Sequence, residues 1–271
     1  TRTRMPLRWF FRGVALIPIL APSLLAAISL IYWFGNQGVL KSWLGGGSIY
    51  GPVGIIIGSC FWVFPHALMI LLTALSTADA RLYEAAEALR TPKWRVFWTV
   101  TLPGAKYGIL SAGFVVFTLV ITDFGVPKVI GGRYNVLATD VYKQVVGQQN
   151  FEMGAVVSVV LLIPAALAFF VDRLVQKKQV ALLSARAVAL EPKPNKRFDN
   201  IMLVYAIIVS LFILGILGMC QFAALFKFFP YNLTLSLKNY QFDLMDGGGW
   251  DSYFNSIEMA SYAAVFGTII V

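Results

Sequence analysis

The sequence predicts an all-α membrane protein, a polytopic bundle of helices, and three observations lead to this class. Hydrophobic residues make up 58% of the 271 positions and charged residues 13%, whereas soluble domains carry about 25% charged residues. The mean hydropathy is +0.73. The apolar residues also gather in runs that reach the roughly 20 residues a helix needs to cross a bilayer.

Five apolar runs qualify as membrane spans, and a sixth begins near Phe254. The five cover residues 9–34, 51–75, 107–126, 153–175 and 201–225. The first run is too long for the hydrophobic region of a cleavable signal peptide, and no small-residue cleavage site follows it. Because the chain starts at Thr1 and stops at Val271 within an apolar run, we expect it to be part of a longer polypeptide.

The positive charges favour one side of the predicted spans. Sixteen of the 22 Lys and Arg residues fall in the N-terminal segment, the loop after the second span and the segment after the fourth, and six fall in the other loops. Cytoplasmic loops of membrane proteins carry such an excess. We therefore expect the N-terminus, residues 76–106 and residues 176–199 to be cytoplasmic, and residues 127–150 to face outward.

A basic stretch divides the chain into three parts. Residues 179–199 are predicted to form a polar cytoplasmic linker, stiffened by the Glu-Pro-Lys-Pro sequence at positions 191–194. Residues 1–178 contain four spans, and residues 200–271 begin a second set. This order predicts an internally duplicated transporter or channel whose second half is truncated.

Other kinds of chemistry find little support. Cys60 and Cys220 lie in apolar runs, which favours neither a disulfide framework nor a metal site. The single histidine, His66, follows Pro65 and is expected to hydrogen-bond a carbonyl that the proline frees. The net charge of +9 suggests nucleic acid, but the basic residues flank spans instead of forming one stripe. We expect no nucleic-acid partner and no metal site.

The segment between the second and third spans is charged and amphipathic. Residues 79–90 predict a short helix with Asp79 as its N-cap, and Pro92 ends it. Trp94 and Trp98 then contribute to an apolar surface that runs up to Pro103. These residues leave two interpretations open: a docking surface for another protein, or an interfacial loop that lies on the lipid headgroups with the tryptophans as anchors.

Residues 84–103 resemble the EAA loop of ABC-importer permeases. That pattern is Glu-Ala-Ala, three residues, Gly, nine residues, Ile, one residue, Leu-Pro. The positions that match it at the family's spacing are Glu84, Ala85, Ala86, Leu102 and Pro103. Val100 replaces the isoleucine conservatively. Arg90 stands in place of the glycine, which can take a positive φ at no cost.

The resemblance covers roughly residues 7–178 and implies the helix bundle of a type I ABC permease. In that family the loop docks on a dimer of cytoplasmic ATPases. The implied ATPase-coupling residues are Glu84, Ala85, Ala86, Arg90, Leu102 and Pro103.

The resemblance also implies an external solute-binding protein and a multi-pass location in the bacterial inner membrane. The chain contains no GxxxxGK[ST] phosphate loop. We therefore expect no cofactor on this chain and no enzymatic activity of its own, with ATP and Mg²⁺ bound by the partner ATPase.

Within the family, residues 122–158 most resemble the fused two-half permeases of ferric-iron, thiamine and 2-aminoethylphosphonate importers. Residues 82–132 most resemble the 2-aminoethylphosphonate group, which implies an importer of that solute. Ferric iron, thiamine and a polyamine are the alternatives.

Three charged residues near the outward loop are candidates for the substrate pathway. Asp123 is an acid near a span end, where it either contacts substrate or caps a helix. Lys128 and Arg133, together with Lys143, either draw an anionic solute toward the entrance or dock an acidic surface of a binding protein.

A channel or ion-coupled secondary transporter is the competing class. It would show the same span count and charge bias, but it has no use for an ATPase-docking loop. Ion-coupled carriers commonly use several intramembrane acids, whereas Asp123 is nearly the only one expected here. A membrane-bound enzyme lacks a nucleophile–base pair in the sequence.

Overall fold

Helices form nearly all of the secondary structure in a computed structural model that describes residues 3–182, 188, 190–241, 243 and 248–270. By its contacts the chain divides into two units, Thr1–Leu217 and Gly218–Val271, and each is described by itself. The predicted all-α membrane class is confirmed by this helical content and by the apolar helices described below.

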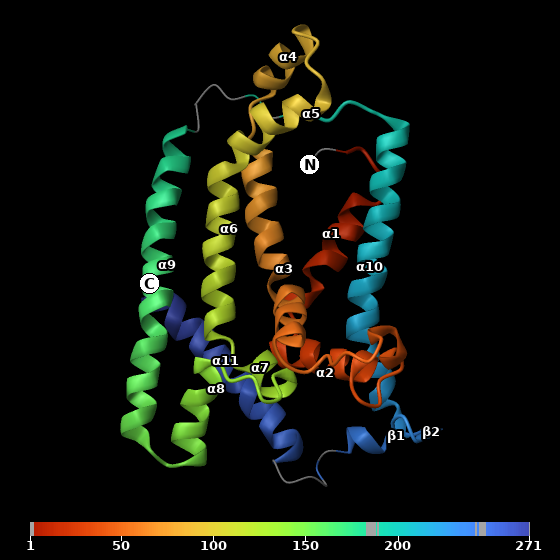
Figure 1. Ribbon diagram of the computed structural model, residues 1–271, viewed down its shortest axis with the longest axis vertical. Helices are drawn as coiled ribbons and strands as arrows, with labels where there is room; N and C mark the ends of the chain where they lie inside the picture. Colours follow the sequence, from red (N-terminus) through yellow and green to blue (C-terminus); the bar gives the residue numbers. More distant parts are fainter. Residues whose placement is uncertain (1–2, 183–187, 189, 242, 244–247, 271) are drawn as a thin grey trace. The chain divides into compact units, whose positions relative to one another are not determined.

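The first unit contains the following elements (Figure 1): α1 (Arg8–Leu16), the 3₁₀ turn η1 (Ile17–Ile19), α2 (Ser23–Phe34), η2 (Lys41–Leu44), α3 (Pro52–Ser76), α4 (Ala80–Ala88), α5 (Lys93–Val96), the π-helical turn η3 (Phe97–Thr101), α6 (Leu102–Thr122), α7 (Gly125–Ile130), α8 (Leu137–Tyr142), the π-helical turn η4 (Lys143–Gly147), α9 (Phe151–Leu182) and most of α10 (Lys196–Ala224).

Among the described residues, four helical segments are long and apolar enough to cross a membrane. They are Pro52–Ser76, Lys93–Thr122, Phe151–Lys177 and Lys196–Ala224. These segments correspond to the second, third, fourth and fifth predicted spans.

The first predicted span, residues 9–34, is not one straight helix. Its two halves, Arg8–Ile19 and Ser23–Phe34, are bent by 98°. Pro18 lies in η1, and Pro22 is extended with ψ of 146° before α2. Proline lacks the N–H that continues a helix and disfavours helical geometry in the preceding residue, so the two prolines account for the bend.

The third span begins earlier than predicted. Pro103 does not end the preceding helical segment, because it lies in the first turn of α6 and the helix runs on from α5 through η3. At the other end α6 stops at Thr122, and Asp123 takes extended backbone geometry.

The core of the first unit joins helices that are distant in sequence. Leu30 of α2, Ile55 of α3 and Val126 of α7 belong to one buried cluster, which also includes Ile213 and Ile216 of α10. The indole N–H of Trp33 donates to the carbonyl of Gly215 at 3.1 Å. The first helix after the predicted linker therefore packs into the unit formed by the first half.

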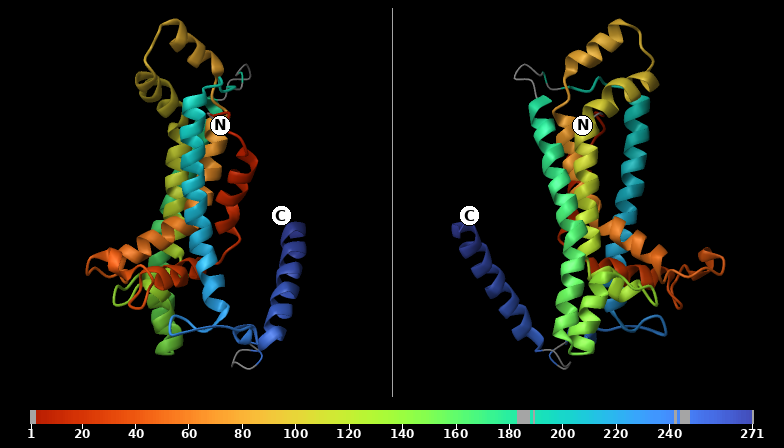
Figure 2. Two further views of the ribbon diagram at one scale, coloured as in Figure 1. Left: turned by 90° about the vertical axis from the view of Figure 1, so that its right-hand side faces the viewer. Right: turned by 60° about the vertical axis from the view of Figure 1, so that its left-hand side comes forward.

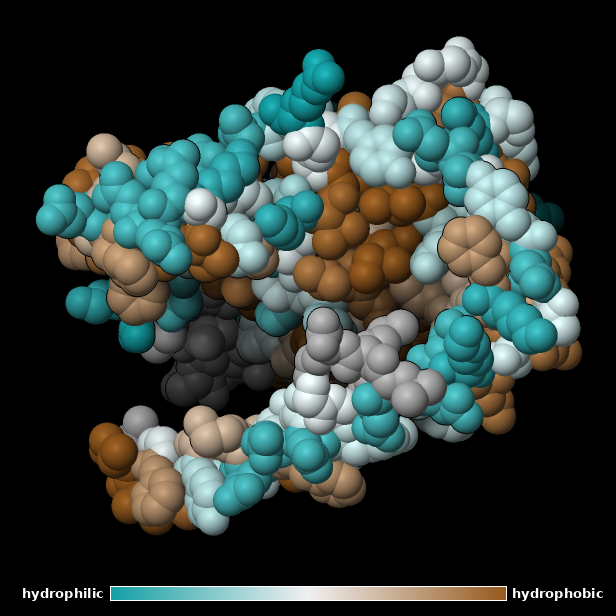
Figure 3. Space-filling model, turned by 90° about the horizontal axis from the view of Figure 1, so that it is seen from below, coloured by the Kyte–Doolittle hydropathy of each residue, from teal (hydrophilic) through white to brown (hydrophobic). Residues whose placement is uncertain are grey.

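The segments predicted to be cytoplasmic gather at one end of the first unit. Figures 1 and 2 show α4, α5 and the start of the chain at that end, and α7 and α8 at the opposite end. Viewed from below, the surface mixes hydrophilic side chains with exposed hydrophobic ones (Figure 3).

The second unit holds the last residues of α10, the antiparallel strands β1 (Phe226–Phe228) and β2 (Asn232–Leu235), the 3₁₀ turn η5 (Lys238–Tyr240) and α11 (Gly249–Ile270). The helix α11 covers the sixth predicted run, but it begins at Gly249 instead of near Phe254.

Candidate functional site

The loop between α3 and α6 forms a capped helix, as its sequence predicts. Asp79 precedes α4 in extended geometry, and its carboxylate accepts a hydrogen bond from Arg81 N at 3.1 Å. At the other end Thr91 N donates to Ala86 O and Arg90 N donates to Glu87 O, both at 2.9 Å. These two bonds form a Schellman motif, which satisfies carbonyls that the helix itself leaves unpaired.

Arg90 takes the backbone conformation that the family's glycine would supply. Its φ is +49°, and it directly follows the last turn of α4, where a left-handed residue closes the Schellman motif. A side chain in this region costs roughly 1–2 kcal/mol. The turn therefore keeps the geometry expected for glycine although arginine occupies it.

The Glu-Ala-Ala sequence is divided between two sides of α4. Glu84 and Ala85 are exposed, and Leu82 beside them is 56% exposed. Ala86 is only 7% exposed, so its side chain packs against its own chain. The role of Ala86 as an ATPase-coupling residue stays a prediction, and in this structure its side chain is covered.

The second arm of the loop carries an aromatic cluster and runs directly into the membrane span. The rings of Trp94 and Trp98 meet edge to face at 5.4 Å, and Phe97 contacts both. Leu102 is half-buried and Pro103 exposed where η3 passes into α6. Helix α5, turn η3 and helix α6 are continuous, so no break separates the second arm from the third span.

Several polar contacts hold α4 in place. Tyr83 Oη donates to Thr101 Oγ1 at 3.0 Å and so joins the two arms of the loop. Ala80 N donates to Val188 O at 2.9 Å, and Lys193 Nζ lies 2.5 Å from Glu87 Oε2. The linker residues 188 and 193 thus contact both ends of the helix.

At the opposite end of the first unit, Asp123 acts as a helix cap. Its carboxylate accepts hydrogen bonds from Ser23 Oγ at 2.7 Å, Gly125 N at 3.3 Å and Val126 N at 3.0 Å. These donors belong to the starts of α2 and α7. The sequence leaves two roles for Asp123, helix capping and substrate contact. The hydrogen bonds in the structure are those of a helix cap, and a contact with substrate stays a prediction.

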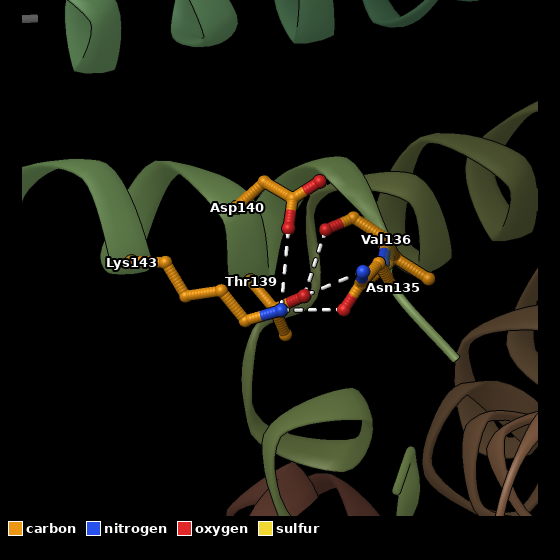
Figure 4. Close-up of polar contacts among 5 residues, drawn as sticks. All are labelled: Asn135, Val136, Thr139, Asp140 and Lys143. Carbon is orange, nitrogen blue, oxygen red and sulfur yellow. Dashed lines mark hydrogen bonds and ion pairs between the residues drawn. The ribbon is translucent and has the colours of Figure 1, made fainter. Parts of the chain in front are cut away.

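Two of the three basic residues of the outward loop are engaged with neighbours. Lys143 bonds Asn135 Oδ1 and lies 3.4 Å from Asp140 Oδ1 (Figure 4). In the same figure Thr139 Oγ1 donates to Val136 O at 2.8 Å and fixes the start of α8. Lys128 Nζ lies over the ring of Tyr142, 4.2 Å from its centre. Arg133 is exposed.

Two polar residues within the predicted spans differ from the expectations. No bond from His66 Nδ1 to a freed carbonyl is found within the described chain, where this buried atom has no partner. Asp172 of α9 is 6% exposed and accepts a hydrogen bond from Gln176 Nε2 at 2.7 Å. Asp123 is therefore not the only acid inside a predicted span, and the position of Asp172 within residues 153–175 was the signal for it.

Comparison with known proteins supplies the family. The sequence profile of the binding-protein-dependent transport system inner membrane component matches residues 2–180. The chain is 27% identical over 283 residues to a Haemophilus influenzae protein that bears the name of a ferric transport system permease, with 97% of this chain and 44% of that protein covered. It is 25% identical over 293 residues to the ferric transport system permease protein of Actinobacillus pleuropneumoniae, with 99% and 42% covered.

A third relative aligns with about half of the chain. The molybdenum transport system permease protein of Azotobacter vinelandii is 29% identical over 136 residues, which cover 49% of this chain and 60% of that protein. The chain spans less than half the length of the two ferric permeases it matches.

The apolar helical segments are those of a polytopic membrane protein. The chain belongs to the family of binding-protein-dependent transport system inner membrane components, and this confirms the resemblance to type I ABC permeases. Its relatives are named as transport permeases and not as enzymes.

Proposed function

We propose that this chain forms part of the membrane pathway of an ATP-driven, binding-protein-dependent importer. The continuous helix from Lys93 to Thr122 carries the proposal, because it connects the loop to the interior of the predicted bilayer without a break. Together with α3 on the other side of the loop, it provides two rigid connections from a docking site to the pathway.

The exposed side of α4 is the proposed docking site for the ATPase. Glu84 and Ala85 lie on it, and Leu102 and Pro103 are placed where the second arm joins the span. Arg90 shapes the turn between the arms. ATP and Mg²⁺ are proposed to bind to the ATPase dimer, and an extracytoplasmic solute-binding protein to dock at the end that carries α7 and α8.

The two interpretations of the loop concern different helices. The aromatic cluster of Trp94, Phe97 and Trp98 lies on α5 and η3, while Glu84 and Ala85 lie on α4. We propose that α4 contacts the ATPase and that the aromatic cluster rests at the lipid interface, where tryptophan is enriched.

Ferric iron is the substrate that the relatives favour. The two relatives that align with nearly the whole chain bear ferric names, whereas none of the relatives described above is named for phosphonate transport. The resemblance of residues 82–132 keeps 2-aminoethylphosphonate as the second candidate. Asp123, Lys128 and Arg133 are retained as pathway residues near the outer entrance.

The arrangement in the membrane is part of the proposal. We place the N-terminus, the loop after α3 and residues 179–199 in the cytoplasm, from the distribution of Lys and Arg. Residues 1–178 form the first permease half, and residues 200–271 begin the second.

Reconstitution of the transporter with its ATPase and binding protein tests the proposal. Glu84→Lys reverses a charge whose contact is worth about 1.5–3 kcal/mol when desolvated, which corresponds to roughly 10- to 150-fold weaker docking. Ala85→Trp blocks close approach. Both variants should insert normally, lose uptake, and either bind the ATPase weakly or leave ATP hydrolysis uncoupled from uptake.

Matched controls make the same changes on an exposed part of α9. Glu152→Lys and Ala155→Trp should bind the ATPase normally, because the start of α9 lies at the end of the first unit opposite α4. Normal uptake by both loop variants would contradict the docking role of α4. Binding protein loaded with ferric iron should stimulate ATP hydrolysis by the transporter, and binding protein loaded with 2-aminoethylphosphonate should not. The opposite result would reverse the substrate assignment without contradicting the docking role of α4.

A further inference from the structure

The hairpin that follows α10 exposes apolar side chains that its own fold leaves uncovered. Within the antiparallel pair of β1 and β2, Phe228 is 64% exposed, Leu233 56% and Leu235 71%. Side chains alternate between the faces of a strand. Phe226 lies opposite Leu235 and Phe228 opposite Asn232, so Phe226, Phe228 and Leu235 share one face of the hairpin, and Lys227 lies on the other face of β1.

Hydrogen bonds fix the hairpin to the end of α10. Asn239 Nδ2 donates to Ala224 O at 3.1 Å and to Phe226 O at 2.7 Å. Ser236 N donates to Leu225 O at 2.8 Å. The last carbonyls of a helix have no partner within it, so Asn239 both caps α10 and holds the hairpin close to the point where the helix ends.

That point lies at a membrane surface if α10 crosses the bilayer. The segment Lys196–Ala224 has the length and composition of a span, so residues directly after Ala224 fall at the boundary between lipid and water. An isolated two-stranded hairpin is only marginally stable in water, and the exposed faces of β1 and β2 need a further contact.

The composition of the hairpin fits this boundary. The rings of Phe228 and Tyr231 stack with centres 5.7 Å apart, and Phe226 packs edge to face on Phe222 at 4.7 Å. Aromatic side chains gather at membrane interfaces. Lys227 lies between the two phenylalanines of β1, and a lysine can extend its charge to the headgroups while its stem covers apolar surface.

We propose that the face of the hairpin formed by Phe226, Phe228 and Leu235 inserts into the headgroup region of the leaflet in which α10 ends, the outer leaflet in the predicted orientation. The lipid contact continues the exposed surface of α10, where Phe222 is 47% exposed. This inference rests on the membrane location of the family and not on ATP-driven transport, so either can fail without the other.

Spin labels on the hairpin test the proposal in the whole chain in lipid nanodiscs, with Cys60→Ala and Cys220→Ala as background. Single labels replace Phe228, Leu235 and, as the control on the other face of β1, Lys227, all of which are exposed in the structure. Power saturation measures collision with oxygen, which concentrates in lipid, and with a water-soluble nickel complex. The oxygen-to-nickel accessibility ratio should be severalfold higher for Phe228→Cys and Leu235→Cys than for Lys227→Cys.

Two other outcomes would overturn the proposal. High nickel accessibility at all three sites would show a hairpin surrounded by water. Low accessibility to both reagents at Phe228→Cys and Leu235→Cys would show that protein covers the face. The measurement is repeated in the transporter assembled with its ATPase and binding protein, and each outcome is interpreted in the same way.

Discussion

Arg90 adopts a left-handed backbone conformation that is strained for arginine and would be unstrained for glycine. Its φ of +49° is set by the Schellman motif at the end of α4. The motif depends on main-chain hydrogen bonds, which form with any residue that can reach this conformation. The arginine therefore changes the stability of the turn without changing its geometry.

Arg90→Gly should stabilise the loop. Removing the side chain relieves the strain of the left-handed conformation, which costs roughly 1–2 kcal/mol. Part of this gain is lost because glycine loses more conformational entropy on folding. We expect slower hydrogen exchange at the backbone amides of positions 90 and 91 in the variant. Arg90→Ala keeps a Cβ and serves as the control; equal gains in both variants would point to the lost charge instead of the backbone.

Asp123 and Ser23 show a second residue-scale effect, the joining of two helix starts by one carboxylate. Asp123→Ala leaves the amides of Gly125 and Val126 without their acceptor, and unpaired buried groups cost about 1–3 kcal/mol each. We expect a lower thermal unfolding midpoint in detergent, with a smaller loss for Ser23→Ala. An altered KM for uptake with an unchanged midpoint would instead assign Asp123 to the substrate pathway.

At the scale of helices, α3 and α6 approach closely near the end of the first unit that carries α4 and α5. A Cβ added to Gly108 of α6 would lie 2.2 Å from Cβ of Ala74 in α3. These are the two helices that flank the loop proposed to dock the ATPase. Close packing at this point makes them move together when the loop is displaced.

Gly108→Ala should therefore loosen the pair of helices. Overpacking typically costs about 1–3 kcal/mol, and we expect a lower unfolding midpoint and reduced uptake per ATP hydrolysed. Gly104→Ala is the matched control on the same helix, because no atom of the described residues lies within 4 Å of its added Cβ and alanine favours the helix by about 1 kcal/mol. A similar loss in both variants would exclude the contact with Ala74 as the cause.

The elements that depend on local signals were predictable, and those that depend on packing were not. Asp79 and Pro92 bound α4 because capping and the absence of a proline N–H act within a few residues. The length of the apolar run 9–34 predicts a single span, but Pro18 and Pro22 within the run determine its bend. The burial of Ala86 depends on which face of α4 meets the rest of the chain, and hydrophobic periodicity in nine residues is too short to fix it.

At the scale of the whole molecule, the charge distribution predicts which segments face the cytoplasm. The structure places the loop after α3 and the outward loop at opposite ends of the first unit. Arg133→Cys and Ala88→Cys are suitable reporters because both residues are exposed. A membrane-impermeant thiol reagent added to intact cells should label Arg133→Cys and spare Ala88→Cys.

Labelling after permeabilisation is the control for this experiment, because both cysteines should then react. The reverse pattern in intact cells would contradict the predicted orientation, because it would place the proposed ATPase-docking site outside the cytoplasm. Gly132 is a poorer reporter, since its φ of +59° would strain a cysteine.

The packing of α10 has a consequence for synthesis of the protein. Ile213 is 2% exposed and Ile216 3%, and both complete the core that α2, α3 and α7 begin. A nascent chain that has been translated only to residue 178 lacks these side chains and the partner of the Trp33 indole. The ribosome must therefore deliver α10 to the insertion machinery before the earlier helices can reach their final packing, and until then they depend on lipid or on the translocon to cover that surface.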